Sequence, residues 1–229
     1  MQKVIITLVG PTCSGKTTLK DQLLATGDFI EVISHTTRPM RNGEVNGETY
    51  HFVTPEQFDE MEFLERIEYN GNIYGGSVAE FEKGFDSGQI PVIIVEPNGN
   101  AQININAKKL GWTVINVWVG CPVGLQAERL VTRLIEDYRA FIQKDGEMAD
   151  YNKIVKEYVG RLTMVQTVES EWPDLFKKSV RATDVAPGHY VADHIPEVMT
   201  IPEFTQENEA DYRENLINYA KQLANKEAA

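Results

Sequence analysis

Cysteine, histidine and basic residues are scarce in this 229-residue chain. It has two cysteines, four histidines, and 22 lysines and arginines against 34 acidic residues, for a formal net charge of -12. Cys13 and Cys121 lie far apart with no metal-ligand spacing, which indicates neither a disulfide framework nor a zinc site and favours a reducing compartment. The acidic balance disfavours a broad nucleic-acid-binding face. The histidines show no ligand spacing either, and we expect structural or surface roles for them (His35, His51, His189 and His194).

Long apolar runs are also absent. No segment approaches the roughly 20 apolar residues that a membrane span needs. The N-terminal stretch MQKVIITLVG has the length of a strand and lacks the longer apolar core and cleavage site of a signal peptide. We therefore expect a cytoplasmic protein whose partners are small molecules, with neither a nucleic acid nor a membrane among them.

Strand-like and helix-like segments alternate along the chain. Continuous apolar runs at 3–9, 91–96 and 113–119 are typical of buried parallel strands. Helical patterns follow at 16–25 and 78–87, after Thr54, over AQININAKKLG and from Pro122 onward, which predicts an α/β fold with a parallel sheet flanked by helices. Residues 184–204 are rich in proline and predict an extended surface excursion. A last helix then carries one apolar face (Tyr212, Leu216, Tyr219, Ala220 and Leu223).

The segment from Gly10 to Thr17, GPTCSGKT, matches the pattern GxxxxGK[ST]. A buried strand precedes it and a helix follows, which is the arrangement that a P-loop requires. Its backbone N–H groups would hold phosphate oxygens, Lys16 would bridge the β- and γ-phosphates of ATP, and the Thr17 hydroxyl would bind Mg²⁺. The expected ATP-binding residues of this loop are Gly10, Pro11, Thr12, Cys13, Ser14, Gly15, Lys16, Thr17 and Thr18.

A second segment, SHTTRPMRNG at 34–43, places two arginines around a proline in an otherwise acidic chain. Arg38 and Arg41 are suited to a dianionic phosphate, because guanidinium groups form charge-assisted and bidentate bonds with phosphate oxygens. Pro39 stiffens the turn between them and lowers the entropy cost of ordering both side chains. This segment therefore predicts a site for a second phosphate-bearing ligand.

The run SHTTRPMRNGEVNGETYHFV resembles the acceptor segment of guanylate kinases, SxTTRxxRxGExxGxxYxFV, and FLERIEYNGNIYGGS at 63–77 resembles their FLExAxxxGxxYGTS. With the P-loop, the resemblance covers roughly residues 3–133. It implies the P-loop nucleoside monophosphate kinase fold and Mg²⁺-dependent transfer of the ATP γ-phosphate to GMP or dGMP. It also implies phosphate contacts from Tyr50 and Tyr74, and guanine contacts from Ser34 and Glu65.

The chain departs from the family pattern at the base site. A family aspartate is replaced by Glu96, which would order the Mg²⁺ water shell or the acceptor, and a second acid is replaced by Ile94. The family often has a hydroxyl residue that helps to hold the guanine O6, and this chain has Gly76 at that position. Loss of the hydroxyl would weaken base discrimination by about 1 kcal/mol and leave room for a substituted base. Ser77 keeps a hydroxyl at the next position, where it also fits a helix N-cap.

The resemblance further implies a lid that closes over ATP. Arg129 and Arg133 match the family's RLxxR pattern, and Arg161 resembles its later lid arginine; Arg129 could equally be a surface charge paired with an acid. We expect Lys16, Arg133 and Arg161 to be catalytic and Arg129 to bind ATP. The predicted division of the single domain is a core (1–33 and 91–128), an acceptor subdomain (34–90), an enlarged lid (129–161) and a core-completing, divergent C-terminal part (162–229).

Two alternatives stay open at this point. A kinase of the same fold could take a different, broader or modified-base deoxynucleotide, as the departures at positions 76, 94 and 96 would allow. The second alternative is a non-catalytic interaction module, although Lys16, Thr17 and both P-loop glycines are retained. The chain could act as a monomer or a homodimer.

Overall fold

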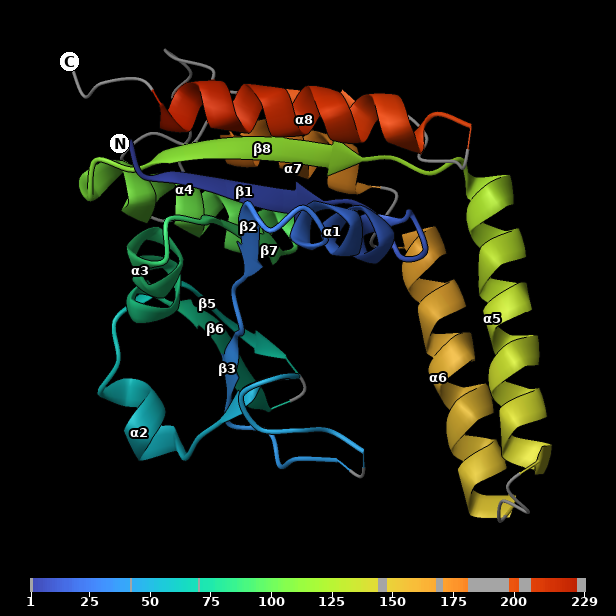
Figure 1. Ribbon diagram of the computed structural model, residues 1–229. Helices are drawn as coiled ribbons and strands as arrows, with labels where there is room; N and C mark the ends of the chain where they lie inside the picture. The colour runs from blue at the N-terminus through green and yellow to red at the C-terminus, as the bar shows by residue number, and fades with distance from the viewer. Residues whose placement is uncertain are drawn as a thin grey trace.

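The computed structural model describes residues 2–41, 43–69, 71–143, 148–167, 171–180, 198–201 and 207–225. It contains a five-stranded core sheet, a smaller four-stranded sheet and a projecting pair of helices (Figure 1). In the described residues, no helix is both long and apolar enough to cross a membrane.

The core sheet is parallel throughout, with the strand order β2-β7-β1-β8-β9. All six residues of β1 are buried, which explains its unbroken apolar sequence. The predicted strands at 3–9, 91–96 and 113–119 are confirmed, with small shifts at the ends. The strands are β1 (Val4–Val9), β2 (Phe29–Glu31), β7 (Ile90–Ile94), β8 (Thr113–Val119) and β9 (Val198–Ile201).

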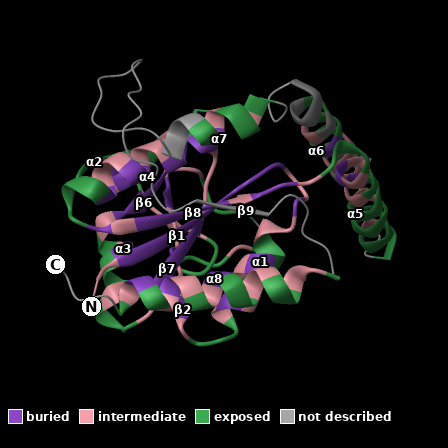
Figure 2. Cartoon of the chain, turned by 90° about the horizontal axis from the view of Figure 1, so that it is seen from above, coloured by how far each residue is buried: buried purple, intermediate pink, exposed green. Residues whose placement is uncertain are grey.

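Helices cover both faces of this sheet (Figure 2). On one face, α1 (Lys16–Leu24) and α8 (Glu209–Ala224) bury leucines such as Leu19 and Leu216 against β1 and β8. On the other face lie α3 (Val78–Asp86), α4 (Pro97–Lys109) and α7 (Trp172–Val180). The predicted apolar face of the last helix is confirmed, because its leucines and alanine are buried and its two tyrosines pack beside them.

The smaller sheet has the order β4-β3-β6-β5 and lies below the core sheet in Figure 1. It is built from β3 (His35–Thr36), β4 (His51–Phe52), β5 (Phe63–Tyr69) and β6 (Asn72–Ser77). Helix α2 (Pro55–Asp59) begins after Thr54, as predicted, and Thr54 and Gln57 form a capping box at its start. No strands were predicted in this region, because β5 and β6 are only partly buried and lack the unbroken apolar runs of the core strands.

A helical pair projects from the core: α5 (Val123–Gln143) and α6 (Met148–Thr167) lie side by side (Figure 1). The predicted helix from Pro122 is confirmed and corresponds to α5.

The predicted surface excursion at 184–204 was partly wrong. Residues 198–201 form β9, which pairs with β8 as an edge strand of the core sheet. The rest of that segment, with His189 and His194, lies outside the described residues.

Candidate active site

The P-loop follows β1 directly and leads into α1 (Gly10–Thr17). Gly10 is required by packing, since a Cβ there would lie 2.1 Å from the carbonyl oxygen of Val119. Gly15 has a φ of 101° and Cys13 a φ of 60°, so the loop turns through left-handed backbone conformations at two positions. This curled backbone is what turns N–H groups toward a bound anion.

Lys16 and Ser14 indicate what the loop is built to hold. The Lys16 ammonium donates to the carbonyl oxygens of Gly10 (2.8 Å) and Pro11 (2.6 Å) and thereby stays at the mouth of the loop. The hydroxyl of Ser14 is buried and has no hydrogen-bond partner among the described residues. A buried unpaired hydroxyl inside a P-loop is suited to a phosphate oxygen, so these residues fit a nucleoside triphosphate.

A cavity of 820 Å³ lies between the P-loop and α5. Arg129 reaches back from α5 and donates to the carbonyl oxygen of Cys13 at 3.0 Å, so its contact is with the P-loop and not only with surface acids. Arg133 lines the same cavity, as do Thr17 and Thr18. Among the described residues, no group of three or more histidine, cysteine, aspartate and glutamate side chains is placed to hold a metal ion.

Arg161 lies on α6, where it does not line either of the two cavities at the P-loop. Its guanidinium donates to Glu157, one turn earlier, with distances of 3.2 Å from Nε and 2.7 Å from Nη2. The structure therefore brings Lys16 and Arg133 to the donor cavity, whereas Arg161 is outside its lining but near enough to Cys13 of the P-loop for an electrostatic interaction.

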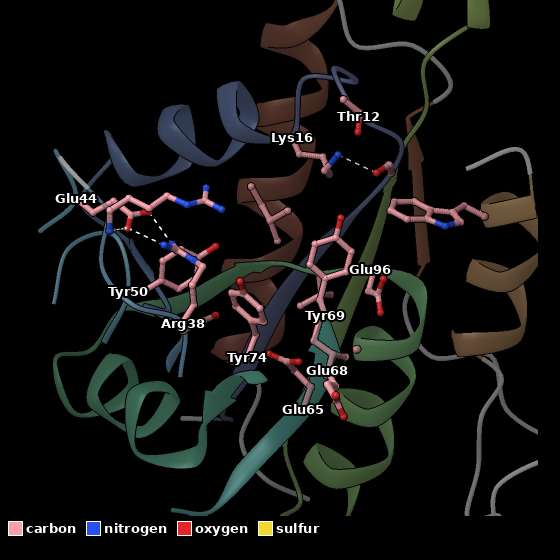
Figure 3. A pocket seen from close by; sticks show the side chains of 18 residues that line it. Thr12, Lys16, Arg38, Glu44, Tyr50, Glu65, Glu68, Tyr69, Tyr74 and Glu96 are labelled. Carbon is pink, nitrogen blue, oxygen red and sulfur yellow. Dashed lines mark hydrogen bonds and ion pairs between the residues drawn. The ribbon is translucent and has the colours of Figure 1, made fainter. Parts of the chain in front are cut away.

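A second cavity, of 570 Å³, joins the P-loop to the smaller sheet (Figure 3). Lys16 borders both cavities. Most of the predicted acceptor residues meet in this second cavity although they come from distant segments: Ser34, Arg38, Arg41, Tyr50, Glu65, Tyr74 and Glu96.

Arg38 is held by an acid that the sequence reading did not assign. Glu44 accepts from Nη1 at 3.0 Å and from Nη2 at 2.7 Å, and it also accepts from the backbone N–H of Arg41 at 2.6 Å. The hydrogen bond from Arg38 and the backbone N–H of Arg41 hold the pKa of Glu44 below its usual range. The Arg38 guanidinium lies over the rings of Tyr50 and Phe52, at 5.6 and 5.5 Å from their centroids.

Glu44 does not use every donor of Arg38, and Tyr74 also interacts with the guanidinium through a side-chain hydrogen bond. Glu44 takes two of the five guanidinium N–H donors, and the carbonyl oxygen of Pro39 takes a third from Nη1 at 2.9 Å. The Nε donor and the second Nη2 donor lie on one edge of the planar group. That edge has the geometry to bind two phosphate oxygens.

Glu65 lies on β5 with only 4% of its surface exposed. Glu65 is therefore a buried strand residue and not a solvated one. Burial raises the pKa of Glu65 to about 7, against the lowering effect of the Gly76 N–H, which donates to Oε1 at 2.7 Å. Nearby Glu96 raises the pKa further. Near neutral pH, Glu65 is therefore present both as a carboxylate and as a neutral acid.

Glu96 occupies the N-cap position of α4 without a side-chain cap hydrogen bond, and it lines the acceptor cavity, where burial raises its pKa. Ile94 lines the same cavity two residues earlier. The substitution of an acid by Ile94 thus makes this part of the wall apolar.

Gly76 and Ser77 do not line the acceptor cavity. A Cβ at Gly76 would lie 3.1 Å from Ile93 Cδ1 and 3.1 Å from Phe81 Cε2, so the expectation that this glycine leaves room for a substituted base is wrong. Ser77 is 3% exposed and accepts from the backbone N–H of Glu80 as the N-cap of α3. Gly76 serves the site through its backbone, which holds Glu65.

Sequence reasoning also missed six other residues that line the acceptor cavity: Ile67, Glu68, Tyr69, Val95, Gly99 and Trp172. Ile67 and Tyr69 follow Glu65 at alternate positions of β5, and a strand pattern would have placed them on one face. Trp172 reaches the cavity from α7, and no motif near it signals this position.

The two described histidines have structural partners. His35 is 8% exposed and stacks on His51 with 4.5 Å between ring centroids, and His51 contacts Glu80 at 3.2 Å. Burial lowers the pKa of His35. The pair joins β3 to β4 beside the acceptor cavity, as expected for structural residues.

A P-loop that shares a cavity with a second anion-binding site defines a class of nucleotide-binding proteins that hold two phosphate-bearing ligands together. A family model described as guanylate kinase matches residues 1–163. The chain therefore belongs to the guanylate kinase family, whose curated relatives are nucleoside monophosphate kinases.

Individual relatives agree with this family. A guanylate kinase of Sulfurimonas denitrificans is 34% identical over 151 residues, covering 63% of this chain and 71% of the relative. One of Pseudomonas fluorescens is 39% identical over 156 residues, covering 65% and 72%. The crystal structure of a guanylate kinase from Anaplasma phagocytophilum aligns with a TM-score of 0.49 and 18% identity, over 98% of this chain and 88% of that one.

Proposed function

We propose that the protein transfers the γ-phosphoryl group of ATP to GMP or dGMP, giving ADP and the nucleoside diphosphate. The observation that carries this proposal is a single cavity lined by both the P-loop Lys16 and the acceptor residues Arg38, Tyr50, Tyr74 and Glu65. A donor phosphate on the loop and an acceptor phosphate on the arginine would face each other across Lys16. Membership of the guanylate kinase family supports the same reaction.

The chemistry asks the protein for positioning and charge neutralisation. The acceptor oxygen is already ionised, so no general base is needed. Lys16 would leave the carbonyl oxygens of Gly10 and Pro11 to contact the transferred phosphoryl group. Bound Mg²⁺, held through Thr17 and the ATP phosphates, would supply further positive charge.

On the acceptor side, two kinds of contact are needed. The open edge of Arg38, with Arg41, Tyr50 and Tyr74, would bind the phosphate. Glu65 as a carboxylate would accept from the adjacent N1–H and 2-amino N–H groups of guanine. Ser34 and Glu96 line the same cavity and would complete the base contacts.

We assign residues 129–161, which include most of α5 and α6, to a lid, and residues 34–90 to an acceptor subdomain. Arg129 and Arg133 already contact or border the donor site. Arg161 would join it when α6 moves toward the P-loop and the Glu157 pair opens. Closure of this kind excludes water from the transfer site.

We place the reaction in the cytoplasm, where both nucleotides are available and free cysteines persist. Cys13 and Cys121 are both free thiols.

The decisive experiment is an acceptor profile. ADP formation should be followed with each common ribo- and deoxyribonucleoside monophosphate in turn, with acceptor-free reactions subtracted as the ATPase background. We expect GMP or dGMP to have the highest kcat/KM. Poor turnover of both, with good turnover of another monophosphate, would overturn the assignment of the acceptor but leave the reaction class intact.

A further inference from the structure

One wall of the acceptor cavity comes from beyond the family-matched residues. The family model ends at residue 163, yet Trp172 lines the same cavity as Lys16, Glu65 and Glu96. The indole is partly buried. This chain therefore adds to the site a large aromatic group that its family motifs do not contain.

The position of Trp172 is fixed by the packing of α7. Phe176 is 3% exposed and packs with Val9 and Trp118, with 5.3 Å between the rings of Phe176 and Trp118. Residues four apart lie on the same face of a helix, so Trp172 follows Phe176 onto that face. Val9 immediately precedes Gly10, which explains why this face of α7 reaches the cavity beside the start of the P-loop.

A second aromatic side chain borders the cavity from β5. Tyr69 is 55% exposed and extends toward Lys16 (Figure 3). It lies four residues after Glu65 on the same strand, and alternate residues of a strand share a face. The strand that presents the buried carboxylate deep in the cavity thus presents an aromatic ring at its open end.

The rest of the cavity explains what these rings are suited to bind. Four carboxylates line it (Glu44, Glu65, Glu68 and Glu96), so an anion is favoured only near the arginines and Lys16. Aromatic faces instead offer planar contact to a nucleobase, which every base can use. We propose that Trp172 is a further acceptor-binding residue, whose indole packs against the nucleoside part of the acceptor together with Tyr69.

This inference rests on the proposed function, since it needs a nucleoside monophosphate in the cavity. Tryptophan fluorescence tests it directly, because the other two tryptophans, Trp112 and Trp118, do not line the cavity. We expect GMP to change the emission of the wild-type protein and inorganic phosphate to leave it unchanged. The GMP response should disappear in Trp172→Phe, and a response that persists in that variant would overturn the proposal.

Kinetics give the second arm of the test. Trp172→Ala should raise the KM for GMP about tenfold, as loss of base stacking does, with the KM for ATP unchanged and Trp172→Phe in between. Lys177→Ala is the matched control, because Lys177 is exposed on the same helix and borders neither nucleotide cavity. An unchanged KM for GMP, or an equal rise for ATP, would reject the role of Trp172 while the reaction itself stands. Failure of the wild-type protein to phosphorylate any guanine nucleotide would instead reject the proposed function.

Discussion

The donor and acceptor cavities meet at Lys16 but are assembled in different ways. The donor site is built around one continuous loop, Gly10–Thr17, with further side chains from α1, α5 and the start of α8. The acceptor site collects side chains from β5, β6, β7 and α7 and from the loops after β2, β3 and β7. A site made by consecutive residues depends on local backbone conformation, whereas a dispersed site depends on the packing of everything that carries it. The two should therefore respond differently to single substitutions.

The largest effect is expected in the donor site. Lys16→Ala should lower kcat by about 10³-fold or more, because the side chain neutralises charge that develops during transfer. The fold should be retained, since the Lys16 ammonium donates to carbonyl oxygens of its own loop and the residue is partly exposed. ADP formation with GMP should be compared with that of Lys109→Ala, an exposed lysine on α4. Equal absence of activity in the wild type and Lys16→Ala would favour a non-catalytic interaction module.

In the acceptor site, Glu44→Gln should act through Arg38. The amide loses the charge and one of the two acceptor oxygens that hold the guanidinium, so Arg38 would no longer present its open edge in one orientation. We expect the KM for GMP to rise about tenfold, with a smaller fall in kcat and an unchanged KM for ATP. Initial rates with each substrate varied separately would measure this. Glu48→Gln, an exposed acid of the same loop, is the matched control, and a lower KM for GMP in Glu44→Gln would show that Glu44 competes with phosphate instead.

The same difference between the sites explains how far sequence reasoning reached. The P-loop could be located because its chemistry is encoded by adjacent residues, and Arg38 and Arg41 because they flank a proline in one short run. The core strands could be predicted from unbroken apolar runs. β9 could not, because its four residues follow a proline-rich stretch and gain strand geometry only by pairing with β8.

Within the acceptor site, the limits are equally physical. Glu65 was predicted as a site residue, but its burial was not. The burial follows from the pairing of β5 with β6 and from the packing of α4 on β5, and neither contact could be predicted from the sequence. Ser77 and Gly76 looked like base contacts because they follow Tyr74, yet β6 turns them toward α3 and the core. Glu44 lay in the quoted acceptor motif and could have been recognised as the counter-ion of its two arginines.

The pH dependence of GMP use should report Glu65. Burial raises its pKa to about 7, and only the carboxylate accepts from both guanine N–H groups, so kcat/KM for GMP should fall as the pH drops below 7. The pH profile of kcat/KM for Glu65→Gln should lack this fall and show only the titration of the GMP phosphate, near pH 6. Rate profiles from pH 5.5 to 8.5 for both proteins would separate the two ionisations. Identical profiles would remove Glu65 from base recognition.

Glu65 also affects stability, with a definite sign. Its folded-state pKa of about 7 lies above the usual value of 4.5, so the folded protein binds more protons between these limits. The free energy of unfolding of the wild type, relative to Glu65→Gln, should therefore decrease as the pH rises from about 4.5 to about 7, and level off above. Urea unfolding of both proteins across this range provides the measurement. If the free energy of unfolding of the wild type relative to Glu65→Gln increased with pH, that result would contradict the burial of a titrating carboxyl group.

The smallest effect tests whether the acceptor site can be restored to the usual family pattern by one residue. Gly76→Ser adds a hydroxyl where the family carries one, but its Cβ would lie 3.1 Å from both Ile93 and Phe81 in the core. These side chains must shift, which should cost about 1 kcal/mol of unfolding free energy, seen as a lower urea midpoint at unchanged slope. Because Gly76 does not line the cavity, we expect no gain in preference for GMP over the other monophosphates. A clear gain in preference for GMP, with an unchanged urea midpoint, would contradict this expectation. It would show that the core accommodates the serine side chain, and that one residue can set base recognition as one loop sets phosphate binding.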